Sequence, residues 1–386
     1  MTAAAPRTVA VVTGSRAEFG LLEPVMNAIA AEPSLRLRTI VAGAHLLPPA
    51  ETWRDIETAG IEIAARIPMQ RAGEGGRLTD ARSAGRGMDG FAGTFAGLRP
   101  HWVVVLGDRI EPFAAAAAAS IAGIAVAHVH GGDRAEGIAD EALRHAITKL
   151  AHLHLAATEA SAQRIVRLGE AEAFVHNVGS PAIDGLDRIE PMSDDDARPL
   201  GDPAAVFLMH PSGLDEKRER DLVRQGLAAL EQAMPGRNVA CFEPNHDAGR
   251  EPILEEIRAA TARRSWPVID HMPRRRFLAL LKRLARRPDG LMVGNSSAGL
   301  IEAAAIRLPA FNIGPRQAGR ERPNNVFDAP SGDEREVRAA IERAMAIDRT
   351  RITHPYGDGC AGPRLAALLA RTDPRDPRLL RKRCAY

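Results

Sequence analysis

Residues 8–20 of the chain read TVAVVTGSRAEFG. The apolar run that ends at Val12 predicts a buried strand, and Gly14 and Ser15 predict a tight turn into a helix. Similar short apolar runs, each bounded by turn residues, recur along the chain with longer amphipathic stretches between them. This alternation is typical of βαβ units, so we predict an α/β protein with parallel sheets covered on both faces by helices.

The strand-like runs form two series, which predict two Rossmann-like, doubly wound parallel-sheet domains with a cleft between them. We place an N-terminal domain at residues 1–189, a C-terminal domain at 190–350 that begins with a linker rich in Asp and Pro, and a final segment at 351–386. In that segment we expect a helix that packs back and a loose basic tail. The predicted strands are Val9–Val12, Leu37–Val41, Ile61–Ala65, Trp102–Leu106, Ile124–His128 and Leu153–Ala157, then Val206–Met209, Val239–Phe242, Val268–Ile269, Leu291–Val293 and Ala310–Ile313.

The composition is that of a globular protein. Of its 386 residues, 45% are hydrophobic and 26% charged, and the net charge of +2 gives no reason to expect binding to nucleic acid. The longest apolar stretch, residues 113–129, is shorter than a membrane span, so we expect no membrane association. Cys241, Cys360 and Cys384 lie far apart, which favours a reducing compartment. Because the N-terminus also lacks the apolar core of a secretory signal, we expect a cytoplasmic protein.

Open parallel sheets bind ligands at the carboxyl ends of their strands, so the residues that follow each strand are candidates for chemistry. Arg16 follows the first strand and could bind a phosphate or carboxylate, although a solvated arginine in an ordinary strand-to-helix turn explains it equally well. Asp108 follows the strand 102–106 and is placed for proton transfer. Its alternative role is to cap the helix that follows.

Carboxylates and imidazoles are dense after the next strand, where the chain carries His130, Asp133 and Asp140. Acid–base catalysis needs groups whose pKa values are pushed apart, and this region supplies candidates. A metal site is the alternative, but no histidine pair shows the i, i+4 spacing with a third ligand, so we expect no metal. At least one of His152 and His154 is better explained as a structural histidine.

The second series has its own polar residues at strand ends. His210 follows the strand 206–209 and could hold a phosphate or pass it a proton. The loop from Glu243 to Gly249, which contains Asn245, is explained by its turn residues without any ligand.

The strongest local signal is residues 293–302, VGNSSAGLIE. Gly294 lets the backbone approach a diphosphate, and the hydroxyls of Ser296 and Ser297 can receive its oxygens at the start of a predicted helix. Glu302 lies about one and a half turns into that helix, within reach of a ribose diol. Arg316 follows the next strand and adds a guanidinium group. We predict a nucleotide-diphosphate site, with helix-to-sheet packing of small residues as the alternative.

Eight segments together resemble the UDP-N-acetylglucosamine 2-epimerases, specifically the hydrolysing branch that makes amino sugars for sialic-acid-like compounds. The resemblance implies the GT-B fold, with the nucleotide held by the C-terminal domain, no metal or redox cofactor, and a homodimer or homotetramer. The segments follow one another over roughly residues 9–325 and are TGSRAEFGLL, AGAHL, LGDRIE, HVHGGD, DEALRHAITKLAHLH, VGSPAID, GNSSAGLIEA and NIGPRQAGR.

The resemblance also implies a reaction. UDP is eliminated across C1 and C2 of a UDP-linked 2-acetamido sugar, and water adds to the resulting 2-acetamidoglycal to give the free sugar with C2 inverted. Asp108 and Asp140 then look like the acid–base carboxylates and His210 like the group on the phosphate side. His130, a further catalytic candidate, stands where non-hydrolysing and animal members carry Glu, so one acid–base role is either unfilled or taken by its imidazole. Asp133, also a catalytic candidate, stands where bacterial hydrolysing members usually carry Glu. UDP-N-acetylglucosamine and its 4-acetamido-6-deoxy analogue are therefore both open as substrates.

A GT-B glycosyltransferase that uses the same nucleotide site is the alternative function, and a nucleotide-sugar binding protein is a weaker one. The density of acidic and histidine groups in the N-terminal half favours the epimerase over both. The residues that we expect to bind the sugar or UDP are Arg16, His45, Arg109, Arg144, Asn245, His271, Gly294, Ser296, Ser297, Glu302, Arg316 and Gln317.

Overall fold

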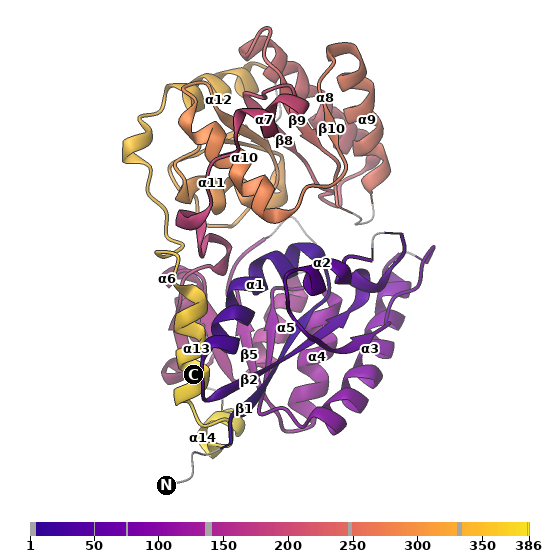
Figure 1. Ribbon diagram of the computed structural model, residues 1–386, viewed down its shortest axis with the longest axis vertical. Coiled ribbons are helices and arrows are strands. Elements are labelled where there is room, and N and C mark those ends of the chain that lie inside the picture. The colour runs from indigo at the N-terminus through magenta and orange to yellow at the C-terminus, as the bar shows by residue number, and fades with distance from the viewer. Residues whose placement is uncertain are drawn as a thin grey trace. The chain divides into compact units, whose positions relative to one another are not determined.

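The computed structural model describes residues 5–49, 51–74, 76–135, 141–245, 249–329, 334–383 and 385 (Figure 1). These residues form two compact units. The first unit holds the described residues up to Asp133, those from 141 to Asp184, and those from Gly357 onward. The second unit holds Gly185–Tyr356, together with Arg134 and Ala135.

The first unit is built on a seven-stranded sheet in which every neighbouring pair is parallel, with strand order β3-β2-β1-β4-β5-β6-β7. The order reverses between β1 and β4, which is where ligands bind in open sheets of this kind. The strands are β1 (Arg7–Thr13), β2 (Leu35–Ala42), β3 (Ile63–Ile67), β4 (Trp102–Leu106), β5 (Ala125–Val129), β6 (Leu153–Ala156) and β7 (Val175–Asn177).

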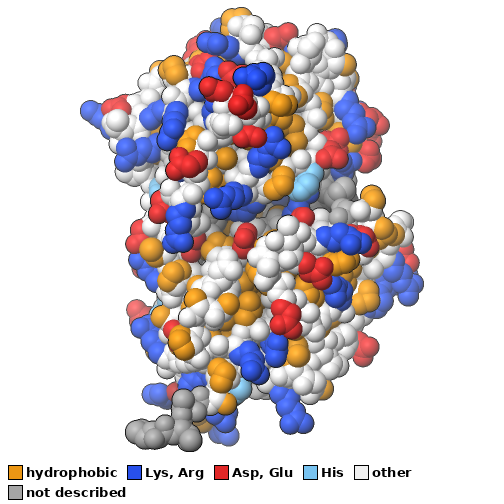
Figure 2. Space-filling view, in the orientation of Figure 1, with side chains coloured by type: hydrophobic (Ala, Val, Ile, Leu, Met, Phe, Trp, Pro, Cys, Tyr) orange, Lys and Arg blue, Asp and Glu red, His pale blue; other side chains and the backbone are white. Residues whose placement is uncertain are grey.

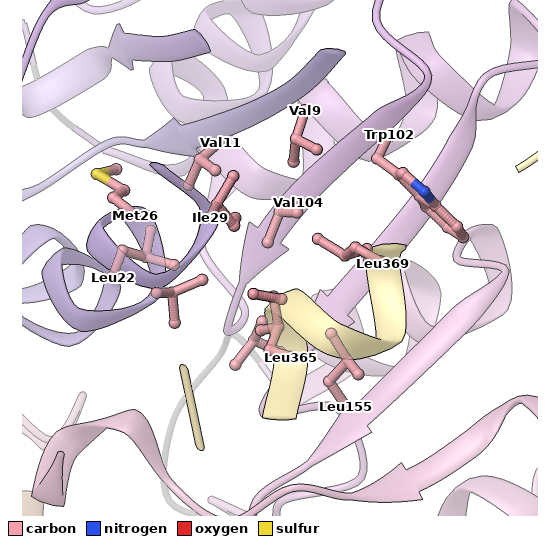
Figure 3. Close-up of a cluster of buried hydrophobic side chains, with 14 of the residues drawn as sticks. Val9, Val11, Leu22, Met26, Ile29, Trp102, Val104, Leu155, Leu365 and Leu369 are labelled. Carbon is pink, nitrogen blue, oxygen red and sulfur yellow. The ribbon is translucent and has the colours of Figure 1, made fainter. Parts of the chain in front are cut away.

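Helices pack on this sheet through apolar stripes. The core includes Val9, Val11 and Val104 from the strands and Leu22 and Ile29 from α1, all of them buried (Figure 3). The helices of the first unit are α1 (Arg16–Ala31), α2 (Trp53–Thr58), α3 (Arg77–Leu98), α4 (Ile110–Ile121), α5 (Glu141–Leu150), α6 (Glu159–Arg167), α13 (Ala361–Arg371) and α14 (Pro377–Leu380), with short 3-10 helices at Gly43–Leu46, Glu172–Phe174 and Pro181–Ile183.

The C-terminal helix α13 is an integral part of the first unit. Its Leu365 and Leu369 are buried in the same core as Val104 and Leu155 (Figure 3). The carboxylate of Asp184 accepts hydrogen bonds from the N–H groups of Ala361 and Gly362, which would otherwise be unsatisfied at the start of the helix. These contacts explain how a segment that follows the second unit in sequence belongs to the first.

The expectation of a loose C-terminal tail is wrong. Leu379 in α14 is buried, and the ammonium group of Lys382 donates to the carbonyls of Lys149 and Ala151, each at 2.6 Å. The same group lies 2.7 Å from the carboxylate of Glu170. Because the last carbonyls of an α-helix lack partners within the helix, Lys382 caps the C-terminal end of α5.

The second unit repeats the architecture with a six-stranded sheet of order β10-β9-β8-β11-β12-β13, again with every neighbouring pair parallel. Its order reverses between β8 and β11. The elements are β8 (Ala205–Leu208), β9 (Val239–Phe242), β10 (Val268–Ile269), β11 (Leu291–Gly294), β12 (Ala310–Ile313), β13 (Val326–Ala329), α7 (Asp194–Ala197), α8 (Glu216–Ala233), α9 (Arg250–Arg264), α10 (Arg274–Arg286), α11 (Glu302–Ala305) and α12 (Glu334–Ala346), with 3-10 helices at Leu186–Arg188, Arg198–Leu200, Ser297–Gly299, Pro315–Gln317 and Arg349–Arg351.

The predicted α/β class with two doubly wound parallel sheets is confirmed. Two strands, β7 and β13, were not predicted because they are short and carry polar or half-buried residues. The expected linker at 190–203 lies within the second unit, where Met192 is buried and donates to the carbonyl of Ala279. Within the described residues, no helix combines the length and apolar character that a membrane crossing requires.

Charged side chains of both signs are interspersed on the face shown in Figure 2. Much of this charge is paired. In the second unit, for example, Arg283 lies 2.7 Å from Asp194 and 2.8 Å from Asp202.

Candidate active site

Asp108 lies at the carboxyl end of β4, beside the point where the order of the first sheet reverses. Its side chain is 16% exposed, and its carboxylate accepts a hydrogen bond from the guanidinium of Arg144 on α5. The same guanidinium donates to the main-chain carbonyl of His130, at 3.1 Å. Arg144 therefore ties the ends of β4 and β5 together and fixes the orientation of the Asp108 carboxylate.

His130 follows β5 in a left-handed backbone conformation, with φ of 62°, and its side chain is buried. Its Nδ1 lies 2.7 Å from Oδ2 of Asp133, and its Nε2 lies 3.0 Å from the hydroxyl of Ser180. The other oxygen of Asp133 accepts from the hydroxyl of Ser161, at 2.7 Å. Both ring nitrogens of His130 and both carboxylate oxygens of Asp133 thus have protein partners, an arrangement that stabilises the turn after β5.

His45 lies in the 3-10 helix after β2 and is fully buried. Its Nε2 is 2.9 Å from the hydroxyl of Thr13 and its Nδ1 is 2.7 Å from the hydroxyl of Thr52. Burial lowers the pKa of His45 to about 4, so the imidazole is neutral at physiological pH. From this position it joins the ends of β1 and β2.

Arg16 and Arg109 place two guanidinium groups at the same edge of the sheet. Arg16 is the exposed first residue of α1, whose N-cap Ser15 accepts from the N–H of Glu18. Arg109 is the N-cap of α4 and is 30% exposed, with its Nε 3.6 Å from the buried carboxylate of Glu111. Anions are stabilised near helix N-termini, so this edge suits a negatively charged ligand.

Asp140 lies outside the described residues. The helix that follows it, α5, begins at Glu141, and the carboxylate of Glu141 is 3.4 Å from Nε2 of His145.

In the second unit, Gly294 ends β11 with φ of 137°, a backbone conformation that side chains rarely allow. A methyl group at this position would overlap the carbonyl oxygen of Leu208 on the neighbouring strand. The turn that follows is lined by Ser296 and Ser297, both partly exposed. The position needs glycine, and the serines beyond it are accessible to a ligand.

The sequence led us to expect one continuous helix after this turn, with Glu302 about one and a half turns into it. Helical structure does follow the turn, but it is divided into two short pieces, and Glu302 is the first residue of the second. Ser297–Gly299 is a 3-10 helix, and α11 spans only four residues from Glu302. The carboxylate of Glu302 is buried and accepts from Arg274 at 2.8 Å. Because the helix is so short, its dipole contributes little, and the polar groups of the turn itself must carry any diphosphate binding.

Asn295 organises this edge of the second sheet, and the sequence did not single it out. Its fully buried amide accepts from the N–H of His210 at 2.7 Å and donates to the carbonyl of His210 at 2.8 Å. Its main-chain carbonyl accepts from Gln317 at 2.8 Å and from Arg316 at 3.3 Å. Only its place between Gly294 and Ser296 could have drawn attention to it.

His210 and Asn245 are brought together at the ends of β8 and β9. Nδ1 of His210 accepts from the N–H of Asn245 at 3.2 Å, so the proton of the neutral ring resides on Nε2. A ring in this tautomer can donate from Nε2 to a phosphate oxygen. His271 is exposed and lies between β10 and α10.

The structure therefore gathers the predicted residues into two groups. One group lies at the carboxyl edge of the first sheet and the other at the carboxyl edge of the second. In the part of the chain that the structure describes, no three His, Cys, Asp or Glu side chains are arranged to hold a metal ion. The first group is Arg16, His45, Asp108, Arg109, His130, Asp133 and Arg144, and the second is His210, Asn245, Gly294, Ser296, Ser297, Glu302, Arg316 and Gln317.

Two Rossmann-like parallel-sheet units, with polar residues gathered where the strand order reverses, define a protein of the GT-B-like class. A sequence model of the UDP-N-acetylglucosamine 2-epimerase family matches residues 27–370. The chain belongs to this family, and its curated relatives place it with the hydrolysing 2-epimerases.

The chain is 34% identical to the hydrolysing UDP-N,N'-diacetylbacillosamine 2-epimerase of Legionella pneumophila, over 98% of this chain and 100% of that one. It is 29% identical to the hydrolysing GDP/UDP-N,N'-diacetylbacillosamine 2-epimerase of Campylobacter jejuni, over 85% of each. Its fold is similar to the crystal structure of the Neisseria meningitidis UDP-GlcNAc 2-epimerase bound to UDP-GlcNAc, with a TM-score of 0.77, 16% identity, and coverage of 95% of this chain and 100% of that one.

Proposed function

We propose that this enzyme hydrolyses a UDP-linked 2-acetamido sugar and inverts its C2, with the UDP-2,4-diacetamido-6-deoxy sugar as the preferred substrate. The preference is supported by the relatives from Legionella and Campylobacter, both of which act on diacetylbacillosamine nucleotides. The single observation that carries the catalytic part of the proposal is the hydrogen bond from Arg144 that orients the Asp108 carboxylate.

The proposed reaction has two steps, an elimination and a hydration. In the first, a base removes the proton at C2 while the C1–O bond breaks, which releases UDP and leaves a 2-acetamidoglycal. In the second, the oxygen of water bonds to C1 and a proton is added to C2 on the opposite face. We assign proton transfer at the sugar to Asp108 and Asp140, because two faces of C2 require two groups.

The C2 proton is only weakly acidic, so stabilisation of the departing diphosphate must lower much of the barrier. We assign this work to His210, Arg316 and the hydroxyls of Ser296 and Ser297, with Arg16 adding positive charge. Support comes from the tautomer of His210, whose Nε2 proton suits a phosphate oxygen, and from the accessible serines. Glu302 is assigned to the ribose, where Arg274 would orient its carboxylate.

The remaining predicted residues receive supporting roles. His130 and Asp133 hold the turn after β5, as their mutual hydrogen bond and their contacts with Ser180 and Ser161 indicate. His45 supports the ends of β1 and β2. Arg109 binds an anionic or polar group of the sugar nucleotide. Asn245 positions His210, Gly294 and Gln317 shape the nucleotide turn, and His271 contacts the nucleotide.

We also propose a cytoplasmic enzyme that assembles as a homodimer or homotetramer and supplies a sialic-acid-like pathway. The cytoplasmic location is supported by Cys241 and Cys360, which are both free thiols. Size-exclusion chromatography with light scattering would test the assembly, and a single species at 41.4 kDa would contradict it.

The test of the reaction is incubation with UDP-N-acetylglucosamine or with UDP-2,4-diacetamido-6-deoxyglucose, in each case without an acceptor. We expect free UDP from both and a kcat/KM at least tenfold higher for the diacetamido substrate. Equal values, or a preference for UDP-N-acetylglucosamine, would contradict the substrate assignment. UDP release that appears only after an acceptor is added would instead identify a glycosyltransferase.

A further inference from the structure

The C-terminal tail of the first unit meets the last turn of α5. The ammonium group of Lys382 donates to the carbonyls of Lys149 and Ala151, each at 2.6 Å. The same group donates to the carbonyl of Thr148 at 3.4 Å, and it lies 2.7 Å from the carboxylate of Glu170, whose side chain is 3% exposed. A single cation therefore holds the end of the helix and balances a buried negative charge.

Glu170 fixes the same tail to the sheet. Its Oε2 lies 3.0 Å from Nε2 of the buried His154 on β6, and its Oε1 lies 2.6 Å from the ammonium group of Lys149. Because a buried carboxylate is costly without cationic or hydrogen-bonding partners, the position of Lys382 is set by β6 as well as by α5. The tail is thus held at a defined place against both elements.

Thr148 continues these contacts toward the carboxyl edge of the sheet. It is fully buried, and its hydroxyl lies 3.0 Å from the carbonyl of Arg144, one turn earlier in α5. The same hydroxyl lies 3.2 Å from Nδ1 of His128 on β5, whose Nε2 donates to the carbonyl of Gly107 at 2.8 Å. Gly107 immediately precedes Asp108, so hydrogen-bonding groups run without a break from the tail to the candidate base.

Two contacts therefore converge on Asp108. The guanidinium of Arg144 donates to its carboxylate, and His128 holds the carbonyl of the residue before it. Gly107 adopts a left-handed conformation, with φ of 78°, so the main chain turns sharply at this point. A displacement of α5 would move Arg144 and Thr148 together, and through them both the carboxylate and the turn that carries it.

We propose that Lys382 is a positioning residue for the reaction, and that it acts on the Asp108 carboxylate through α5. This inference rests on the proposed function. Without the ammonium group, the last carbonyls of α5 lose a donor and Glu170 loses one of its cations. The end of α5 then loosens, and the turn after β4 loses its fixed orientation. Proton transfer at the sugar slows, while UDP, which we assign to the second unit, binds as before.

The first test measures kcat for UDP release and the Kd for UDP in variants of the tail. Lys382→Met should lower kcat by about 10- to 100-fold and leave the Kd within about threefold of the wild type. Lys382→Arg keeps a cation at this place and should recover most of the lost rate. Arg383→Met removes a charge from the exposed neighbouring residue and should keep the wild-type kcat. A wild-type kcat in Lys382→Met would overturn the inference.

Thr148→Val tests the route, because it removes the hydroxyl and keeps the shape of the side chain. If Lys382 acts through α5 and Thr148, the double variant should be no slower than the slower of the two single variants. Rate losses that multiply in the double variant would overturn this route.

Hydrogen exchange of the free protein, followed by mass spectrometry, gives a reading that does not depend on activity. In Lys382→Met we expect exchange to quicken more at residues 107–109 than in β1, whereas a mere loss of stability would quicken both alike. Equal acceleration at both, or acceleration confined to α5, would overturn the inference. A wild type that releases no UDP would instead refute the proposed function, while the exchange pattern would still support the link between Lys382 and the turn.

Discussion

Arg144 donates hydrogen bonds to the carboxylate of Asp108 and to the main-chain carbonyl of His130, so one buried guanidinium joins the ends of β4 and β5. The two strands are neighbours in the sheet, and each is followed by a turn that carries candidate catalytic groups. A guanidinium with fixed partners on both turns holds the Asp108 carboxylate in one orientation. Asp108 is thus positioned before any substrate arrives, as proton transfer requires.

Asp108→Asn should lower kcat by about 10²- to 10⁴-fold, because the amide keeps the shape of the carboxylate and cannot accept the C2 proton. The Kd for UDP, measured by calorimetry, should remain within about threefold of the wild type, since Asp108 is assigned to the sugar. A parallel loss of UDP affinity would show that the residue acts on the nucleotide instead.

Asn295→Ala should weaken UDP binding by about 10- to 100-fold. The substitution removes the amide that pairs with both main-chain groups of His210, and it leaves buried groups unsatisfied at roughly 1–3 kcal/mol each. Calorimetric titration with UDP measures the effect. Asn238→Ala, which removes an exposed amide bonded to the carbonyl of Gly201, is the control and should bind UDP normally. Normal UDP affinity in Asn295→Ala would mean that the turn does not depend on this residue.

Lys382→Met should lower the free energy of unfolding of the first unit by about 2–4 kcal/mol, because it removes the charged cap of α5 and one partner of buried Glu170. Urea unfolding monitored by circular dichroism measures the loss. Lys217→Met, at an exposed position of α8, should change it by less than about 0.5 kcal/mol. If the two variants are equally stable, the tail is not an integral part of the unit.

Acid should destabilise the first unit through buried neutral histidines. Nε2 of His128 donates to the carbonyl of Gly107 at 2.8 Å, and burial lowers the pKa of His128 to about 3. Because the folded pKa lies below the ordinary 6.5, the stabilisation is complete above pH 6.5 and is lost as the pH falls toward 3.

As the pH falls from 6.5 to 5, the free energy of unfolding should decrease in both the wild type and His128→Asn. The slope of the wild type should be steeper by about 1.4 kcal/mol per pH unit, which is the contribution of one protonated group. Urea unfolding at several pH values measures this slope. His145→Asn, whose ring is 40% exposed, should keep the wild-type slope. If His128→Asn has the same slope as the wild type, protonation of His128 does not destabilise the folded protein.

The sequence predicted the strands well where short apolar runs are buried, as at Trp102–Leu106 and Val239–Phe242, whose bounds the structure reproduces. It missed β7 and β13, which are short strands at sheet edges with mostly half-buried residues. It also treated the C-terminal tail as loose, because nothing local reveals that Lys382 meets the carbonyls of a helix more than 230 residues earlier.

The sequence predicted candidate site residues where a side chain suited to proton transfer or phosphate binding directly follows a predicted strand, as for Asp108 and His210. The supporting contacts were not predictable from the sequence. Asn295 acts on His210, 85 residues away, and Glu111 is a charged residue that a single sequence would place in solvent. These roles depend on how the strand ends come together.

The most direct test of the central claim is the reaction run in D₂O without an acceptor and followed by proton NMR. If UDP leaves by elimination and water adds to the glycal, the free sugar should have the inverted configuration at C2 and carry deuterium there. A released sugar that keeps its original C2 configuration and its C2 proton would contradict the account.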